Sequence, residues 1–190
     1  MKKVILLVVI FISFVDFSLA DENKTEILIV YYSRSGNTKL LAEAVEEGAN
    51  EVEGVTVKIC SVDSARMEDV KSAHAIILGS PVYNANTAPK IQQFINKWPF
   101  KNSPLKNKVG AAFVTAGGIS AGEEIVLTNI LNSMLIFGMI VVGGDDWKSA
   151  FGASAIVSEK PFSKTIDNQF IIKAKSLGKR VAEIALKINK

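Results

Sequence analysis

The length, composition and charge of this chain are those of one globular domain. Its 190 residues are 48% hydrophobic and 22% charged, which excludes an intrinsically disordered protein and provides for a continuous core. The 22 basic and 19 acidic residues give a net charge of +3, and the lysines and arginines are scattered along the sequence. We therefore expect no nucleic-acid partner.

The N-terminus has the three parts of a secretory signal peptide. The pair Lys2-Lys3 precedes an apolar run, Val4–Val15, and Ser18-Leu19-Ala20 places small residues before a cleavage point. We therefore expect a signal peptide over residues 1–20, a mature domain over residues 21–190 and a secreted or periplasmic location. Removing two lysines and one aspartate lowers the net charge from +3 to +2. The alternative is an uncleaved membrane anchor, for which the apolar run is short.

The sequence contains no convincing metal site or catalytic nucleophile. Cys60 and His74 are its only cysteine and histidine, so no intramolecular disulfide is available and a zinc or Cys–His site is not credible. Gly118-Ile-Ser-Ala-Gly122 matches the G-x-S-x-G of a nucleophile elbow, but such a hydrolase needs a histidine after the serine, and His74 precedes it. No Walker-type phosphate-binding motif is present.

Apolar runs alternate with helical periodicity along the mature chain. Runs rich in β-branched and aromatic residues predict strands at residues 27–32, 55–60, 73–78, 109–114 and 138–143. Apolar residues three and four positions apart predict helices over residues 40–48, 89–98, 123–135 and 170–188. We also expect a short helix within residues 64–71, Thr87 as the N-cap before Pro89, Trp98 in the core, and an irregular segment over residues 145–161.

This alternation predicts an α/β fold, with a parallel sheet covered by helices on both faces. In such sheets ligands bind at the carboxyl ends of the strands. Three loops rich in Gly, Ser, Thr and Asn follow predicted strands, at Ser33–Thr38, Ser80–Thr87 and Thr115–Gly122. Their coincidence at one edge predicts a ligand site.

The first loop has the chemistry of a phosphate cradle. Backbone N–H groups at the start of the following helix have no partners within that helix, and the helix dipole adds positive potential there. Gly36 permits a tight turn and a close approach of the backbone. For this loop taken alone, the alternative is a capped strand-to-helix turn without a ligand.

Three segments of the sequence resemble those that bind FMN in the flavodoxin-like superfamily, and in particular in WrbA-type NAD(P)H:quinone oxidoreductases. They are Val30-Tyr-Tyr-Ser-Arg-Ser-Gly-Asn-Thr38, Gly79-Ser-Pro-Val-Tyr-Asn-Ala-Asn86 and Val109-Gly-Ala-Ala-Phe-Val-Thr-Ala-Gly-Gly118. Phe137-Gly-Met139 and Phe151-Gly-Ala-Ser154 are similar to family junctions. The resemblance covers nearly the whole mature chain. It implies a flavodoxin-like three-layer sandwich, with a five-stranded parallel sheet in the order 2-1-3-4-5.

The resemblance also implies a role for each loop. The FMN phosphate would be held by Ser33, Arg34, Ser35, Gly36, Asn37 and Thr38. The ring and ribityl chain would be lined by Pro81, Val82, Tyr83, Asn84, Ala85 and Asn86, with Tyr83 stacked on the ring. The polar edge of the ring would be closed by Thr115, Ala116, Gly117, Gly118, Ile119 and Ser120. The redox chemistry belongs to the cofactor, so the protein itself needs no acid, base or nucleophile.

Three functions remain open on this reading. The first is two-electron reduction of a quinone or similar acceptor by NAD(P)H. The second is a flavodoxin-like carrier that passes electrons between redox proteins, but such carriers tend to be strongly acidic, and the near-neutral charge favours the enzyme. The third is a fold without its flavin, because export delivers an unfolded chain. The resemblance further implies a homo-oligomer in which neighbouring subunits complete the site.

Overall fold

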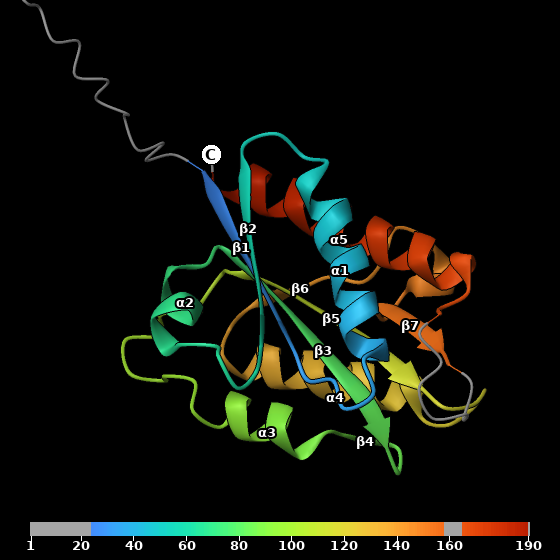
Figure 1. Cartoon of the computed structure of the whole chain (residues 1–190). Coiled ribbons are helices and arrows are strands. Elements are labelled where there is room, and N and C mark those ends of the chain that lie inside the picture. Colours follow the sequence, from blue (N-terminus) through green and yellow to red (C-terminus); the bar gives the residue numbers. More distant parts are fainter. Residues whose placement is uncertain (1–23, 158–164, 190) are drawn as a thin grey trace, which may run out of the picture.

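The computed structural model describes residues 24–157 and 165–189, so the predicted signal peptide lies outside the described residues. The described chain forms a parallel β-sheet between two layers of helices (Figure 1). Within these ranges no helix has the length and apolar composition needed to cross a bilayer.

The sheet has the strand order β2-β1-β3-β5-β6, and its main strands are parallel. The strands are β1 (Thr25–Tyr31), β2 (Val55–Ser61), β3 (Ala75–Tyr83), β5 (Val109–Ala116) and β6 (Ile140–Val141). Taken in chain order, this is the expected order 2-1-3-4-5. The alternating burial of β2 agrees with its place at an edge.

The fifth position in the sheet is shared by two short strands. β6 pairs with the start of β5, and β7 (Ala153–Ile156) pairs in parallel with its end, from Phe113 to Ala116. The expected strand over residues 138–143 is therefore shorter than predicted, and the expectation of an irregular segment was wrong for β7. β7 lacks the apolar run that marks the other strands, and its pairing depends on the distant β5.

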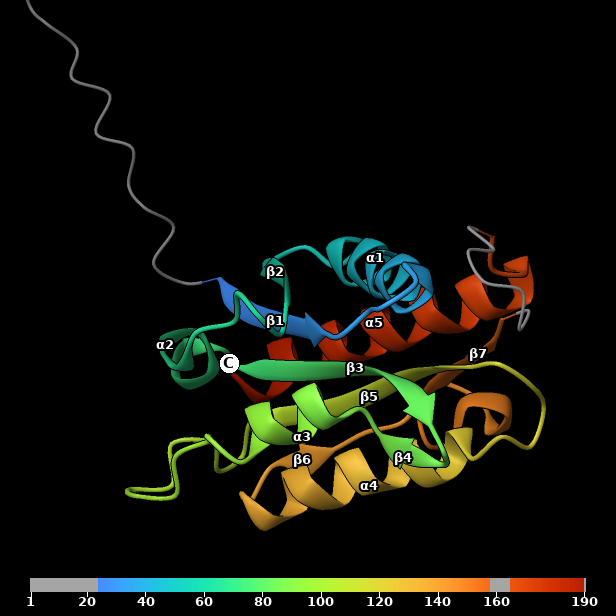
Figure 2. The same cartoon turned by 60° about the horizontal axis from the view of Figure 1, so that its bottom comes forward.

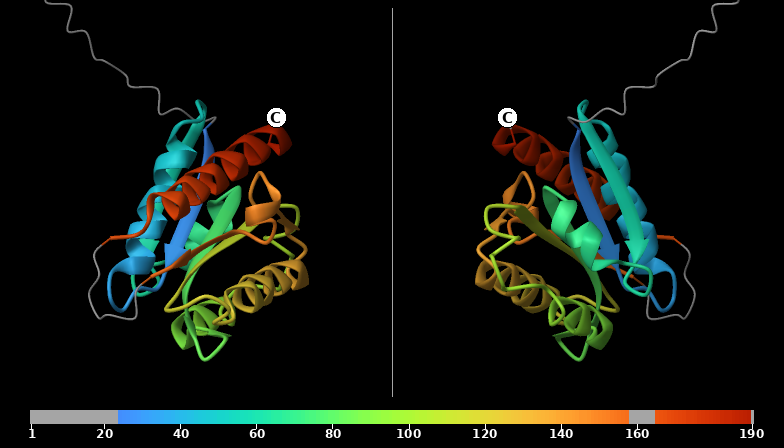
Figure 3. Two further views of the ribbon diagram at one scale, coloured as in Figure 1. Left: turned by 90° about the vertical axis from the view of Figure 1, so that its right-hand side faces the viewer. Right: turned by 90° about the vertical axis from the view of Figure 1, so that its left-hand side faces the viewer.

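Two helices cover one face of the sheet and three cover the other (Figures 2 and 3). On the first face lie α1 (Asn37–Asn50) and α5 (Asn168–Ile188). On the second lie α2 (Met67–Ser72), α3 (Pro89–Ile95) and α4 (Glu123–Ile136). β1 is apolar throughout because its alternate residues face both layers: Ile27 and Ile29 meet α1 and α5, while Leu28 and Val30 meet the opposite layer.

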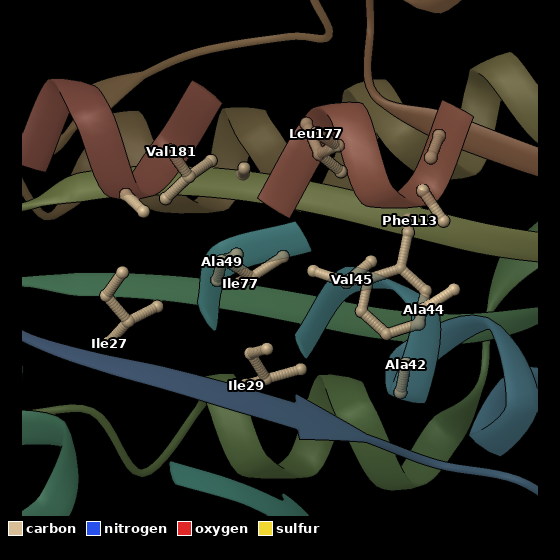
Figure 4. Packing of buried hydrophobic residues seen from close by; sticks show 14 of the residues in the cluster. Ile27, Ile29, Ala42, Ala44, Val45, Ala49, Ile77, Phe113, Leu177 and Val181 are labelled. Carbon is tan, nitrogen blue, oxygen red and sulfur yellow. The ribbon is translucent and has the colours of Figure 1, made fainter. Parts of the chain in front are cut away.

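The core under α1 and α5 is shown in Figure 4, where Ile77 and Phe113 of the sheet lie beneath Val45 and Leu177 of the helices. The two helices pack very closely, because a Cβ on Gly48 would lie 1.9 Å from the carbonyl oxygen of Lys175. On the opposite face Trp98 is 3% exposed, so the prediction of a core tryptophan is confirmed.

Candidate functional site

The three predicted loops lie together at the carboxyl edge of the sheet, after β1, β3 and β5 (Figure 1). Two contacts join the first loop, with the Tyr32 that precedes it, to the other two loops. The hydroxyl oxygens of Thr38 and Thr115 lie 2.8 Å apart in a buried hydrogen bond, and the rings of Tyr32 and Tyr83 meet edge to face at 6.4 Å. The fold therefore assembles the edge that the loop sequences predicted.

The first loop leads from β1 into the N-terminus of α1 and is organised by one serine. The Ser33 hydroxyl oxygen accepts hydrogen bonds from the backbone N–H of Gly36, at 3.1 Å, and of Lys39, at 3.2 Å. Gly36 has a φ of 96°, and a Cβ there would meet nothing within 4 Å. Glycine is thus required by the backbone conformation and not by crowding.

This arrangement leaves several donors at the start of α1 without acceptors. Within residues 24–157 and 165–189, the backbone N–H groups of Ser35, Asn37 and Thr38 have no hydrogen-bond acceptor. They stand at the positive end of a 14-residue helix. An anion at this point would satisfy both the donors and the dipole.

Asn37 and Thr38 turn buried polar side chains into the loop. Asn37 is 5% exposed, and its Oδ1 atom has no partner among the described residues. Thr38 is 1% exposed and is satisfied by Thr115. The orphaned Asn37 Oδ1 is notable because a buried acceptor without a donor is costly, so it favours a ligand that donates hydrogen bonds here.

The second predicted loop is largely a β-hairpin. β3 continues through Pro81, Val82 and Tyr83 and pairs in antiparallel fashion with β4 (Asn86–Thr87). Asn84 and Ala85 form the turn with φ values of 51° and 57°, as in the tight turns that join antiparallel strands. The expected N-cap was wrong by one residue: Thr87 lies in β4, and Ala88 occupies the cap position.

Hydrogen bonds of Ser80 and close packing against the third loop hold the hairpin in place. The buried Ser80 hydroxyl accepts from the Ala88 N–H at 2.9 Å and donates to the Pro81 carbonyl at 2.8 Å. At the tip, a Cβ on Gly122 would lie 2.5 Å from Ala85 Cβ. The third loop therefore rests directly against the turn of the hairpin.

Tyr83 lies on this hairpin beside Arg34 of the first loop and Tyr32, which directly precedes that loop. Burial raises the pKa of the Tyr83 phenol, its neighbour Tyr32 raises that pKa further, and the Arg34 guanidinium opposes the shift. The phenol is therefore neutral at physiological pH. Lys90, which is paired with Asp63 at 2.8 Å, lies 5.4 Å from the centre of the Tyr32 ring.

The third loop offers backbone donors and one carboxylate. Among the described residues, the N–H groups of Gly117, Gly118 and Ile119 have no acceptor. The Ser120 N–H donates to Glu123 Oε1 at 3.2 Å, while Glu123 Oε2 is buried without a partner. The Ile119 side chain is 84% exposed, so this residue presents its backbone N–H without packing against the core.

The structure thus brings all eighteen predicted site residues to one edge, and it adds Tyr32 and Glu123 to them. The place of Tyr32, directly before the first loop, was the available signal for the first addition. For Glu123 the sequence indicates only an acidic residue in the first turn of a helix, which gives no signal for a role in the site. Within residues 24–157 and 165–189, no group of three His, Cys, Asp or Glu side chains could hold a metal ion.

Comparison with known proteins decides the family. The sequence profile described as NADPH-dependent FMN reductase matches residues 25–153. The chain belongs to the NADPH-dependent FMN reductase family. Its match begins at β1 and ends at the start of β7, so it includes all three loops.

Relatives of this chain include proteins named flavodoxin and proteins named NAD(P)H dehydrogenase (quinone). The chain is 32% identical to a flavodoxin of Aquifex aeolicus over 166 residues, covering 83% of this chain and 85% of that protein. It is 30% identical to an NAD(P)H dehydrogenase (quinone) of Archaeoglobus fulgidus over 190 residues, covering 85% and 98%. A WrbA-like flavodoxin from Agrobacterium tumefaciens has the same fold, with a TM-score of 0.74 at 20% identity and coverage of 86% and 99%. The resemblance to flavodoxin-like proteins is confirmed.

Proposed function

We propose that this protein is an FMN-binding flavoprotein that uses NAD(P)H to reduce quinones or similar acceptors by two electrons. One observation carries the proposal: three loops of an FMN reductase family member converge at one edge of the sheet, and the first and third present unpaired backbone N–H groups there. Curated relatives named NAD(P)H dehydrogenase (quinone) support the choice of acceptor.

The first loop fits the phosphate end of FMN. The free N–H groups of Ser35, Asn37 and Thr38 suit a phosphate dianion at a helix N-terminus. The orphaned Asn37 Oδ1 accepts hydrogen bonds only, and the ribityl hydroxyls are donors. The residues present therefore fit the group that the family implies.

The hairpin and the third loop fit the ring. Tyr83 provides a neutral aromatic surface, and the N–H groups of Gly117 and Gly118 are free to donate to the polar edge of the ring. When bound, FMN supplies the two-electron redox chemistry. The protein orients the ring with these backbone donors, which also tune its reduction potential.

A flavodoxin-like electron carrier is the second candidate, and the relatives named flavodoxin favour it. The two candidates differ in whether the protein oxidises NAD(P)H unaided. The net charge of +2 for the mature chain favours the enzyme, because electron carriers of this kind tend to be strongly acidic.

The first experiment is an absorbance and fluorescence titration of residues 21–190 with FMN. We expect saturable binding with perturbed flavin bands and quenched fluorescence, whereas no binding at micromolar FMN would reject both redox candidates. The second is oxidation of NADH or NADPH in the presence of 1,4-benzoquinone. Turnover without an added reductase supports the enzyme, and turnover that needs a reductase supports the carrier.

Export and assembly are part of the proposal. We propose cleavage after Ala20, so that the mature protein acquires FMN outside the cytoplasm, and a homo-oligomer, as the WrbA-type resemblance implies. Mass spectrometry of the N-terminal peptide of the protein recovered from cells tests the cleavage. Sedimentation of the FMN-loaded protein tests the assembly, and a monomer at working concentration would contradict it.

A further inference from the structure

A second polar surface lies at the opposite, amino edge of the sheet. A groove of about 410 Å³ opens there between the end of α2, the segment before β5 and the C-terminal end of α5. Figure 2 shows these elements together around the start of β3. β5 runs from this groove to the third loop, so the groove lies about 25 Å from the flavin site.

The lining of the groove is cationic. Among the described residues, the lining includes Lys71, Lys106 and Lys108, together with His74, and no Asp or Glu side chain. In the part of the chain that the structure describes, the ammonium groups of Lys71 and Lys106 make no ion pair or hydrogen bond, and both residues are exposed. Two unpaired positive charges thus face the same space.

Lys108 is held at the edge of this space by the backbone. Its Nζ donates to the carbonyl oxygens of Lys71, at 2.5 Å, and of Ala73. Burial lowers the pKa of Lys108, and the carboxylate of Glu26 opposes that shift. The half-buried ammonium is thus positioned by α2 and lacks full hydration, which strengthens its attraction for an anion.

The helix ends at this edge do not cancel the charge. α2 and α5 both direct their C-termini here, and each helix end is equivalent to about half a negative charge. Three ammonium groups, set against these two helix ends and the Glu26 carboxylate near Lys108, leave an excess of about one positive charge. His74 adds a neutral donor: its Nδ1 accepts from the Glu26 N–H at 2.9 Å, so Nε2 carries the proton.

We propose that this groove binds a phosphate-bearing anion, with the ammonium groups of Lys71, Lys106 and Lys108 and the N–H of His74 as its partners. Two further features extend the surface. Ile188, which is 47% exposed, gives the groove an apolar rim. Asn189, which lines the groove, donates to the Thr25 hydroxyl at 3.4 Å, so the start of β1 lies beside the groove.

Soluble phosphates and membrane phospholipids share this chemistry, and the test separates them. Every described element lies between Thr25 and Ile188, so residues 21–190 are used for all measurements. One arm titrates inorganic phosphate and follows the backbone amide signals of residues 71–74 and 106–109 by NMR. The other measures sedimentation with vesicles of phosphatidylcholine alone or mixed with phosphatidylglycerol.

The variants are Lys71→Gln with Lys106→Gln, and a control with Lys148→Gln and Lys173→Gln, which changes the net charge equally elsewhere. We expect the first pair to weaken anion binding about tenfold or more, and the control to have little effect. Binding of phosphate and not of vesicles assigns a soluble ligand, and binding of phosphatidylglycerol vesicles assigns a lipid headgroup. Absence of both, or equal loss in the two double variants, overturns the proposal. Far-UV circular dichroism confirms that each variant is folded.

Discussion

The two edges of the sheet, at the carboxyl and amino ends of its strands, expose different kinds of polar group. At the carboxyl ends of β1, β3 and β5, the available polar groups are backbone N–H groups held by small residues. Toward the amino ends they are charged side chains, such as the lysines of the groove and the buried Asp69 with its partners. The first surface is set by the conformation of the backbone, and the second by electrostatics. Their responses to substitution, pH and salt should therefore differ.

The largest effect is expected where the carboxyl edge depends on a missing side chain. A Cβ on Gly79 would lie 2.1 Å from Cζ of the buried Phe113. We expect Gly79→Ala to lower the free energy of unfolding by about 3 kcal/mol, because the ring or the strand must move. Urea denaturation measures the loss, and FMN binding should weaken with it.

Gly36→Ala is the matched control. It places the same methyl group in open space but at a φ of 96°, so a loss of about 1 kcal/mol is expected from backbone strain alone. Equal losses in the two variants would show that the contact with Phe113 is not the reason for glycine at Gly79.

This difference between the edges also explains how much the sequence could predict. The phosphate-loop residues are contiguous, and each loop follows an apolar run, so the carboxyl edge is visible in the linear pattern. The strand order and both helical layers follow from the alternation of those runs with amphipathic stretches and from the resemblance. The errors of the sequence pattern were local. For example, Ser80 to Tyr83 were predicted as part of a loop but form the end of β3.

The remaining features depend on pairing between distant residues. β7 is a strand only because β5 offers it a partner, and the buried contact between Thr38 and Thr115 spans 77 positions. Lysines that look scattered in the sequence are gathered at the amino edge by the fold, as Lys71 and Lys108 are. Linear charge patterning could not reveal that groove.

The hydroxyl pair that joins two loops tests the carboxyl edge next. Thr38→Val leaves the Thr115 hydroxyl buried without its partner, and we expect a loss of about 2 kcal/mol in unfolding free energy. Thr115→Val should have a similar effect, and the double variant should lose less than the sum of the two. Chemical denaturation of all three variants gives the coupling, and strict additivity would contradict a direct hydrogen bond between them.

A charge placed in the first loop tests whether its donors serve a phosphate. Asn37→Asp puts a carboxylate beside the free N–H groups of Ser35 and Thr38. We expect FMN affinity to fall about tenfold or more through charge repulsion, and affinity for riboflavin, which has no phosphate, to change much less. Fluorescence titrations with both flavins measure the difference.

Asn50→Asp, at the other end of α1, provides the control with the same charge change. It should leave FMN affinity nearly unchanged. An equal loss of affinity for FMN and for riboflavin in Asn37→Asp would mean that the substitution disturbed the loop. It would contradict phosphate binding at this loop.

The smallest effect is expected from Asp69, and it depends on pH. A hydrogen bond from Arg66 and another from Lys58, at 2.6 Å, lower the pKa of Asp69 to about 2, below the usual 3.8. The folded state therefore favours the ionised carboxylate. The resulting stability is present above about pH 5 and is lost as the pH falls toward 2. Because both cationic partners are largely exposed, we expect about 1 kcal/mol and a further decrease in high salt.

Asp69→Asn should remove this part of the pH dependence, as thermal unfolding between pH 7 and pH 2 would show. Asp63→Asn breaks an exposed pair with Lys90 and should change stability little at any pH. If the stability of the two variants falls in the same way with decreasing pH, the burial of Asp69 does not account for the pH dependence. If only Asp69→Asn flattens the profile, the amino half of the sheet is stabilised by charge, whereas the stability lost in Gly79→Ala should be insensitive to salt.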